Sequence, residues 1–277
     1  MTINCKGNLI DLSTPKVMGI LNITPNSFYD GGKYKDQLSI LNQVEKMLRE
    51  GATFIDVGAY SSRPGAASVP EEEELQRIVP IIGLLIKEFP EILLSVDTFR
   101  SKVGEACLKN GATLINDISA GNLDKHMFRT IAKYNVPYIM MHMKGTPRNM
   151  SELTDYNDLI GDILYYFSEK VAAARLQGIN DLVLDLGFGF AKTVDQNYQL
   201  LQNLELFQTF DLPILVGLSR KSMIYKVLGT DAEGALNGTT ALHMYALNKG
   251  ATILRAHDVK EAMECIRLTQ KLREQNN

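Results

Sequence analysis

Eight short apolar segments, each followed by a stretch with helical character, constrain the fold of this chain more than any other feature. The segments are VMGILN (17–22), FIDVGA (54–59), LLSVDT (93–98), LINDIS (114–119), YIMMHM (138–143), LVLDLG (182–187), ILVGLS (214–219) and TILRAH (252–257). Almost continuous apolar strands are expected in a parallel sheet whose two faces are both covered. The alternation therefore predicts repeated strand-helix units.

The stretch after residue 68 shows the helical periodicity most clearly. Apolar residues recur there every three or four positions, so that one face is apolar: Leu75, Ile78, Val79, Ile82, Leu85, Ile86 and Phe89. Ser68 and Glu71 have the spacing of a capping box, which predicts that the helix begins at this point. Pro80 lies inside the pattern and is expected to kink the helix.

Four glycines precede predicted strands and follow predicted helices: Gly51, Gly111, Gly178 and Gly250. A left-handed residue commonly ends a helix at this place, and glycine adopts that conformation without strain. Eight units in about 250 residues are the signature of a (β/α)8 TIM barrel. An open, doubly wound sheet is the alternative. Because no linker-like tract interrupts the 277 residues, we expect residues 1–277 to form one domain.

The overall charge argues against several classes of function. The chain carries 29 Lys and Arg against 32 Asp and Glu, a net charge of −3, so no broad basic field for nucleic acid is expected. No apolar run is long enough to span a bilayer, and the first residues lack the apolar region of a signal peptide. The three cysteines, Cys5, Cys107 and Cys265, are far apart and indicate free thiols in a reducing cytoplasm.

Polar residues gather where the predicted strands end. They are Asn22, Ser61, Ser62, Arg63, Asp97, Asn116, Asp117, His142, Asp185, Lys221, Ser222, Arg255 and His257. Arg255 and His257 are two residues apart, so both point to the same side of an extended segment. Buried polar groups without partners are costly, which favours a shared polar pocket at the carboxyl end of a barrel. Internal salt bridges that close the barrel are the alternative.

The charges in this pocket are of two kinds. Cationic groups are suited to phosphate oxygens: Arg63, Lys221, Arg255 and His257. Asp97, Asn116 and Asp185 offer acceptors for a heterocycle that is rich in N–H groups. A single ligand with a polar ring and a phosphate tail would satisfy both sets.

Eight motifs that follow one another from about residue 15 to 260 resemble the dihydropteroate synthase family of pterin-binding barrels. They are ILNITPNSFYDGG, SSRPGA, SVDTF, NDIS, MHMKGTP, DLGFGFAK, GLSRKS and RAHDV. The resemblance implies an enzyme of folate biosynthesis that joins 6-hydroxymethyl-7,8-dihydropterin diphosphate to 4-aminobenzoate and releases pyrophosphate. It also implies Mg²⁺ as the cofactor, a homodimer, and a target of sulfonamides.

The resemblance assigns the pterin and the diphosphate to the following residues. The pterin-binding set is Asp97, Asn116, Ile118, Met141, Asp185, Gly217 and Lys221. The diphosphate-binding set is Ser62, Arg63, Arg255 and His257. The residues with a catalytic role are Asp97, Lys221, Arg255 and His257. Other interpretations exist for some of them: Asp97 could cap the next helix, Arg255 could form a structural bridge with Asp258 as a neighbour, and Ile118, Met141 and Gly217 could be plain core.

The second substrate and the metal are assigned in the same way. The 4-aminobenzoate set is Pro25, Phe28, Ser62, Arg63, Phe190, Lys221 and Ser222. Ser222 is expected at a helix N-terminus, where an anion is favoured. Asn22 is the implied magnesium contact, which agrees with the few protein ligands that Mg²⁺ needs, although an Asn at this place could also cap a loop. Phe190 could instead be a core residue.

The sequence departs from the family pattern at two aromatic positions, Tyr29 and Tyr60. Two competing functions also share the barrel. A corrinoid-linked methyltetrahydrofolate methyltransferase would need the pterin-reading residues but no diphosphate clamp. A non-catalytic paralogue should have lost part of the clamp or of the 24–32 loop. The complete set in this sequence favours the synthase. The segment 235–249 has a mixed apolar surface that could serve the implied homodimer.

Overall fold

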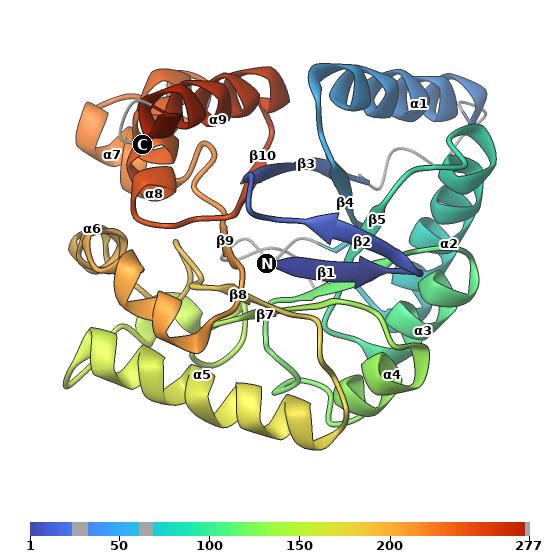
Figure 1. Cartoon of the computed structure of the whole chain (residues 1–277). Helices are drawn as coiled ribbons and strands as arrows, with labels where there is room; N and C mark the ends of the chain where they lie inside the picture. The colour runs from blue at the N-terminus through green and yellow to red at the C-terminus, as the bar shows by residue number, and fades with distance from the viewer. Residues whose placement is uncertain (24–32, 61–68, 275–277) are drawn as a thin grey trace.

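The computed structural model describes residues 1–23, 33–60 and 69–274, and it confirms the barrel. Eight parallel strands close in the order β10-β3-β4-β5-β6-β7-β8-β9 (Figure 1). They are β3 (Lys16–Asn22), β4 (Phe54–Gly58), β5 (Leu94–Asp97), β6 (Leu114–Asp117), β7 (Tyr138–Met141), β8 (Leu182–Asp185), β9 (Ile214–Val216) and β10 (Ile253–Ala256). Closure by β10 against β3 excludes the open, doubly wound sheet.

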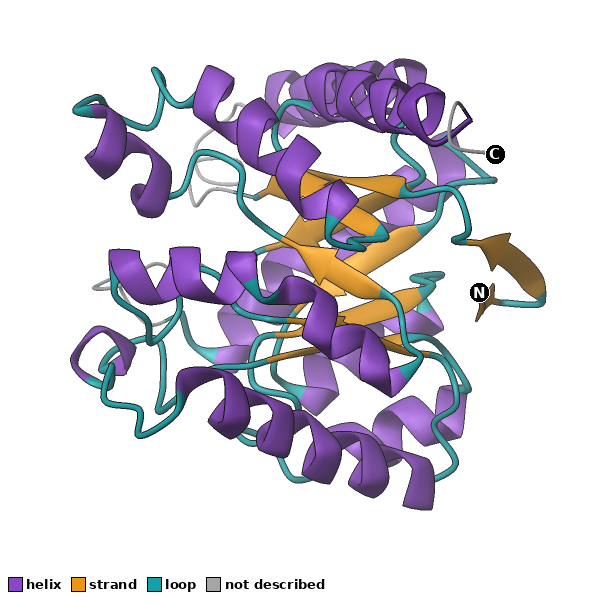
Figure 2. Ribbon diagram, turned by 60° about the vertical axis from the view of Figure 1, so that its left-hand side comes forward, coloured by secondary structure: helices purple, strands orange, loops and turns teal. Residues whose placement is uncertain are grey.

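Helices surround this barrel, as Figure 2 shows with the strands inside the helical layer. They are α1 (Lys33–Glu50), α2 (Glu71–Glu88), α3 (Ser101–Lys109), α4 (Met127–Tyr134), α5 (Leu159–Leu176), α6 (Val194–Gln202), α7 (Ser222–Leu228), α8 (Leu236–Asn248) and α9 (Val259–Glu274), with the short helices η2 (Met150–Glu152) and η3 (Leu204–Phe210). Within the described ranges, no helix is long and apolar enough to cross a membrane.

The predicted helix ends agree with the structure at the glycines and disagree at the capping box. Gly51, Gly111, Gly178 and Gly250 all have positive φ, between 80° and 111°. In contrast, α2 begins at Glu71 with Pro70 as its N-cap, so Glu71 is the first helical residue rather than the third. A proline disfavours the helical conformation in the residue before it, which prevents α2 from starting earlier. Ser68 lies outside the described residues.

Pro80 lies inside α2, as the sequence pattern predicted. The kink that was expected from it stays a prediction.

An N-terminal hairpin that the sequence analysis did not predict closes one end of the barrel. It consists of β1 (Thr2–Cys5) and β2 (Asn8–Asp11), joined by Lys6 and Gly7, which both have positive φ. Such two-residue turns suit the twist of a hairpin. In Figure 1 the hairpin lies across the middle of the ring of helices.

The hairpin packs on an apolar layer inside the barrel. Ile3 and Cys5 are fully buried and belong to one cluster with the inward residues of the strands: Met18, Phe54, Leu114, Ile139, Val183, Leu215 and Ile253. Four of these come from alternate strands, β4, β6, β8 and β10, which is the layered packing of this architecture. The amino-terminal end of the barrel is therefore filled with side chains.

Candidate active site

A polar layer lies directly above the apolar one, because residues two apart on a strand share a side. Two positions beyond Phe54, Leu114, Val183 and Ile253, the same four strands carry Asp56, Asn116, Asp185 and Arg255. Asp56, Asn116 and Asp185 are buried, and Arg255 is partly buried. The carboxyl half of the barrel thus encloses a compact set of charges.

Arg255 is at the centre of this set. Its Nε donates to Asp56 Oδ2 at 2.6 Å, and its Nη2 donates to Asp97 Oδ2 at 2.9 Å. Asn116 Nδ2 also donates to Asp56 Oδ2, at 3.0 Å. Burial alone would lower the pKa of Arg255, but the carboxylates of Asp56 and Asp97 outweigh it and raise that pKa above its ordinary value. The structural bridge considered above therefore exists, although Asp258 is not its partner.

Asp97 has an unusual protonation equilibrium. Burial raises the pKa of Asp97 from 3.8 to about 7; Arg255 opposes the shift, whereas Asp56 adds to it. About 15% of the side chain remains exposed, so that it can meet a ligand at the mouth of the barrel. Asp97 does not cap the next helix, since the N-cap of α3 is Arg100.

Lys221 and Asp185 form a second charged region. Burial lowers the pKa of Lys221 to about 8, while the nearby carboxylate of Asp185 acts in the opposite direction. Burial raises the pKa of Asp185, and its Oδ1 accepts a hydrogen bond of 2.8 Å from Gly187 N. Lys221 Nζ donates to the carbonyl oxygen of Phe188 and lies 4.9 Å from the ring centre of Phe190.

The loop after β8 passes very close to the backbone of the residue that follows β7. Gly187 has a φ of 70°, and a Cβ at this position would collide with the carbonyl oxygen of His142. Phe190 is half-buried and packs against an apolar wall that consists of Ile118, Met141, Met143, Met150 and Ala191. A flat ring that entered the mouth would meet this wall on one side and the charged groups on the other.

His257, Ser222 and Asn22 complete the described part of the site. His257 Nδ1 lies 3.0 Å from Ser219 Oγ, and His257 N donates to the same oxygen at 3.2 Å. Ser222 is the first residue of α7, as predicted. Asn22 ends β3 and is exposed, beside Gly58 of β4. Gly217 directly follows β9, where a Cβ would lie 3.6 Å from Lys221 Nζ.

Comparisons with known proteins identify the family of this barrel. Residues 18–257 match the model of a pterin binding enzyme. The dihydropteroate synthase of Escherichia coli K12 is 42% identical over 272 residues, which are 98% of this chain and 96% of that protein. This chain belongs to the dihydropteroate synthase family.

Solved structures of dihydropteroate synthases have the same fold. A Yersinia pestis enzyme in complex with a sulfonamide drug superposes with a TM-score of 0.92 at 42% identity and covers 99% of this chain and 100% of its own. A Xanthomonas albilineans enzyme with 4-aminobenzoic acid gives a TM-score of 0.90 at 36% identity, with 98% of each chain covered.

Several residues that the sequence analysis named lie outside the described residues. They are Pro25, Phe28, Tyr29, Ser61, Ser62 and Arg63.

The second departure from the dihydropteroate synthase pattern, Tyr60, can be placed. Its ring meets Phe99 edge to face with 5.3 Å between centroids, and the guanidinium of Arg100 lies 5.5 Å from its centre.

Two residues that the sequence analysis placed in the pocket face away from it. Asp117 follows Asn116 and so points to the opposite side, where it accepts hydrogen bonds from Ser119, Gly121 and Tyr138. His142 directly follows β7 and contacts the rings of Tyr166 and Phe167 in α5.

A buried lysine holds His142 in that place. Lys192 Nζ lies 3.0 Å from His142 Nδ1 and donates to the carbonyl oxygens of Gly187 and Phe190. Burial lowers the pKa of Lys192 to about 7. Lys192 thus joins His142 to the loop that carries Phe190.

Asp56 is the residue that the sequence analysis missed. It is fully buried, and its Oδ1 has no hydrogen-bond partner among the described residues. The signal was present in the segment FIDVGA, where one carboxylate interrupts an apolar strand two positions after Phe54. Asp56 anchors both Arg255 and Asn116.

Proposed function

We propose that this chain condenses 6-hydroxymethyl-7,8-dihydropterin diphosphate with 4-aminobenzoate to give 7,8-dihydropteroate and pyrophosphate. The observation that carries the proposal is the polar layer, in which Arg255 donates hydrogen bonds to Asp56 and Asp97 and Asn116 donates to Asp56. Membership of the dihydropteroate synthase family supports the same reaction.

The pterin ring would bind in the polar layer. Asp185 can accept two N–H bonds from the aminopyrimidinone edge, and the Asn116 amide can read a neighbouring edge. Ile118 and Met141 would contact the ring face from the apolar wall. Lys221 and Gly217 would also border the ring, and they lie close together, since a Cβ at Gly217 would be 3.6 Å from Lys221 Nζ.

The diphosphate would bind to Arg255 and His257, assisted by Ser62 and Arg63. A guanidinium has five N–H donors, and the two that contact Asp56 and Asp97 leave three for other acceptors. As the C–O bond to the diphosphate breaks, negative charge grows on the leaving group, and fixed donors stabilise that charge. The ionised carboxylate of Asp97 would stabilise the cation that develops on the pterin methylene carbon.

The 4-aminobenzoate would lie over Phe190, with its carboxylate near Lys221 and Ser222 and with Pro25, Phe28, Ser62 and Arg63 on the other side. Its amine attacks the methylene carbon directly, so the protein supplies orientation and charge stabilisation rather than a nucleophile. We expect a sulfonamide to compete for this place; the related Yersinia pestis enzyme forms a complex with a sulfonamide drug.

Asn22 fits the proposed magnesium ion. Its amide oxygen is a hard ligand at the mouth, and the described residues contain no group of three or more His, Cys, Asp or Glu side chains that could hold a metal. Mg²⁺ keeps several waters and binds through few protein ligands, so Asn22 together with the diphosphate would suffice. The bound ion would offset part of the diphosphate charge.

We also propose a homodimer in a reducing cytoplasm. Apolar side chains are exposed on adjacent helices: Val227 (59%) and Leu228 (54%) in α7 and Tyr245 (40%) in α8. The cysteines are all free and buried, which suits a compartment without disulfides. Sedimentation equilibrium of the wild type and of Val227→Glu would test the dimer: the variant should be monomeric.

The reaction is tested by measuring pyrophosphate release with Mg²⁺, in the presence and absence of 4-aminobenzoate. We expect dihydropteroate only when both substrates are present, and Arg255→Ala should lower kcat/KM by about 10²- to 10³-fold. A wild type that binds the dihydropterin but releases no pyrophosphate would disprove the synthase activity. The methyltransferase and the non-catalytic paralogue would then have to be considered.

A further inference from the structure

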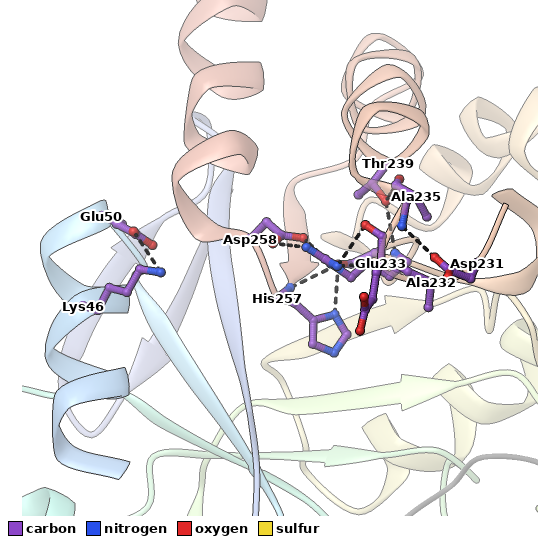
Figure 3. Close-up of polar contacts among 12 residues, drawn as sticks. Lys46, Glu50, Asp231, Ala232, Glu233, Ala235, Thr239, His257 and Asp258 are labelled. Carbon is purple, nitrogen blue, oxygen red and sulfur yellow. Dashed lines mark hydrogen bonds and ion pairs between the residues drawn. The ribbon is translucent and has the colours of Figure 1, made fainter. Parts of the chain in front are cut away.

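Arg220 and Asp258 form a bidentate ion pair that ties the segment after β9 to the start of α9. Arg220 Nε donates to Asp258 Oδ2 at 2.8 Å, and Nη2 donates to Asp258 Oδ1 at 2.8 Å. Arg220 Nη1 reaches the carbonyl oxygens of Ala232 and Glu233 at 3.3 and 3.4 Å. Figure 3 shows Asp258, Ala232 and Glu233 gathered beside His257. One guanidinium thus joins three segments of the chain.

Each member of this pair is a chain neighbour of residues that are proposed to bind substrate. Arg220 lies between Ser219, which contacts His257, and Lys221. Asp258 directly follows His257. The pair therefore connects the proposed 4-aminobenzoate side of the site to the proposed diphosphate side. The two charges of the pair neutralise each other.

The backbone at Arg220 indicates that this connection imposes a conformation. Its φ is 56°, in the left-handed region that a non-glycine residue occupies only when its surroundings determine it. Arg220 N donates to Thr239 Oγ1 at 3.1 Å, and Thr239 Oγ1 donates to the carbonyl oxygen of Ala235 at 2.9 Å. The start of α8 and the ion pair together hold the turn that precedes Lys221.

We propose that Arg220 and Asp258 are positioning residues that keep Lys221 and Ser222 in register with His257. The inference rests on the proposed function, because it assigns these neighbours to the two substrates. A planar guanidinium that makes two parallel bonds to a carboxylate fixes orientation as well as distance. A displacement of about 1 Å in a positioned group can cost on the order of 100-fold in rate.

An ordinary structural ion pair is the competing explanation. The side chains of Arg220 and Asp258 are 28% and 19% exposed, so the pair is partly buried, and the cost of removing two charges from water makes such a pair weak evidence for stability. The chain offers a matched control at the other end of β10. Lys249, shortly before this strand, pairs with Glu205 at 2.8 Å. Glu205→Gln removes a similar charge at the amino-terminal end of the barrel.

The experiment compares Asp258→Asn, Arg220→Gly, the double variant and Glu205→Gln. Arg220→Gly removes the guanidinium and also relieves the left-handed backbone, so that folding is preserved. Steady-state kinetics would give kcat and the KM for 4-aminobenzoate, and calorimetry would give the affinity for inorganic pyrophosphate with Mg²⁺. All values are expressed per folded molecule.

We expect both single variants to lower kcat/KM by about 10- to 100-fold and to weaken pyrophosphate binding by about tenfold. The double variant should lose no more kcat/KM and pyrophosphate affinity than the more strongly impaired single variant, because each single substitution already breaks the same ion pair. Glu205→Gln should stay within about twofold of the wild type in every measurement. If Asp258→Asn does not fold, Arg220→Lys replaces it and should show the same pattern, since lysine lacks the fork.

Unchanged kinetics and pyrophosphate affinity per folded molecule, with only a lower Tm, would overturn the inference. Strictly additive losses in the double variant would also overturn it. Failure of the proposed function is recognised separately, because the wild type would then form no dihydropteroate. In that case, the pyrophosphate affinities still decide whether the ion pair positions His257.

Discussion

The amino-terminal and carboxyl-terminal halves of the barrel interior are built from the same strands. In one half, β4, β6, β8 and β10 point Phe54, Leu114, Val183 and Ile253 inward; in the other half they point Asp56, Asn116, Asp185 and Arg255 inward. Full burial of a large apolar side chain stabilises a fold by about 1.5–3 kcal/mol, whereas a buried ion pair is often no better than an apolar replacement. Stability and ligand chemistry are thus separated by two residues along each strand.

Truncation in the apolar half should have the largest effect on stability. Phe54→Ala removes a fully buried ring beneath the polar layer and leaves a cavity. We expect a loss of about 3–5 kcal/mol in the free energy of unfolding, measured by urea denaturation. The kcat of the remaining folded enzyme should change less than about threefold, since the ring touches no proposed ligand. A large loss of kcat per folded molecule would show that the two halves are not separable.

A substitution in the polar half should lower activity strongly and change stability little. Asp185→Asn keeps the size of the side chain but presents N–H groups to the N–H groups of the pterin. We expect kcat/KM to fall by about 10²- to 10³-fold. The free energy of unfolding should change by less than about 1 kcal/mol, because the lost charge was itself penalised by burial. Equal changes in both quantities would contradict the division of roles.

Asp97 should make both the stability and the activity of the protein depend on pH. Its pKa in the folded protein, about 7, lies above the ordinary value of 3.8, so between these values the folded protein retains a proton that the unfolded chain has lost. The stability from this group is therefore complete below about pH 4 and decreases as the pH rises through about 7. Urea titrations of the wild type should show this decrease, and Asp97→Asn should lack it.

Activity should follow Asp97 in the reverse direction. The ionised carboxylate is the form that stabilises a developing cation, so kcat/KM of the wild type should rise as the pH passes about 7. Stability curves of the wild type and Asp97→Asn that run parallel between pH 4 and 8 would show that the folded-state pKa is not raised.

The smallest expected effect concerns a hydroxyl at the boundary of the two halves. Ser95 pairs in register with Asp56 and is fully buried, and its Oγ has no hydrogen-bond partner among the described residues. We expect Ser95→Ala to raise the free energy of unfolding by up to about 1 kcal/mol. The control is Thr113→Val, because Thr113 Oγ1 donates to the Leu94 carbonyl oxygen and its loss should destabilise by about 1 kcal/mol. If both substitutions change the free energy of unfolding in the same direction, the distinction between an unpartnered and a hydrogen-bonded hydroxyl is refuted.

The barrel could be predicted because its signal is repeated. Each strand contains buried apolar residues, and glycines mark the ends of four of the preceding helices, so an error in one unit leaves the others intact. The hairpin β1–β2 has no such repetition: its four-residue strands are partly exposed, and only Lys6 and Gly7 hint at a turn. The start of α2 was misplaced because the effect of Pro70 on Val69 outweighed the capping pattern.

The site was predictable as a list of polar strand ends but not as a network. Successive side chains on a strand point to opposite faces, so Asn116 lies inside the barrel and Asp117 outside it. The prediction placed both in the pocket because it did not apply this rule. Asp56 was passed over because it lies in the middle of β4 rather than at its carboxyl end, although it belongs to the same layer as Asn116 and Arg255. Which carboxylate pairs with Arg255 depends on the closure of β10 against β3, which brings residues 199 positions apart into contact. Such contacts are a property of the closed barrel.

The hairpin that covers the amino-terminal end gives the barrel a floor. Ile3 and Cys5 pack against the apolar layer, and that layer fills the interior of the barrel beneath Arg255. A ligand that reaches Asp185 must therefore come and go through the same mouth. In the proposed arrangement the pterin lies deeper than 4-aminobenzoate, so we expect the pterin to bind first. Pyrophosphate and the finished product must then share one exit.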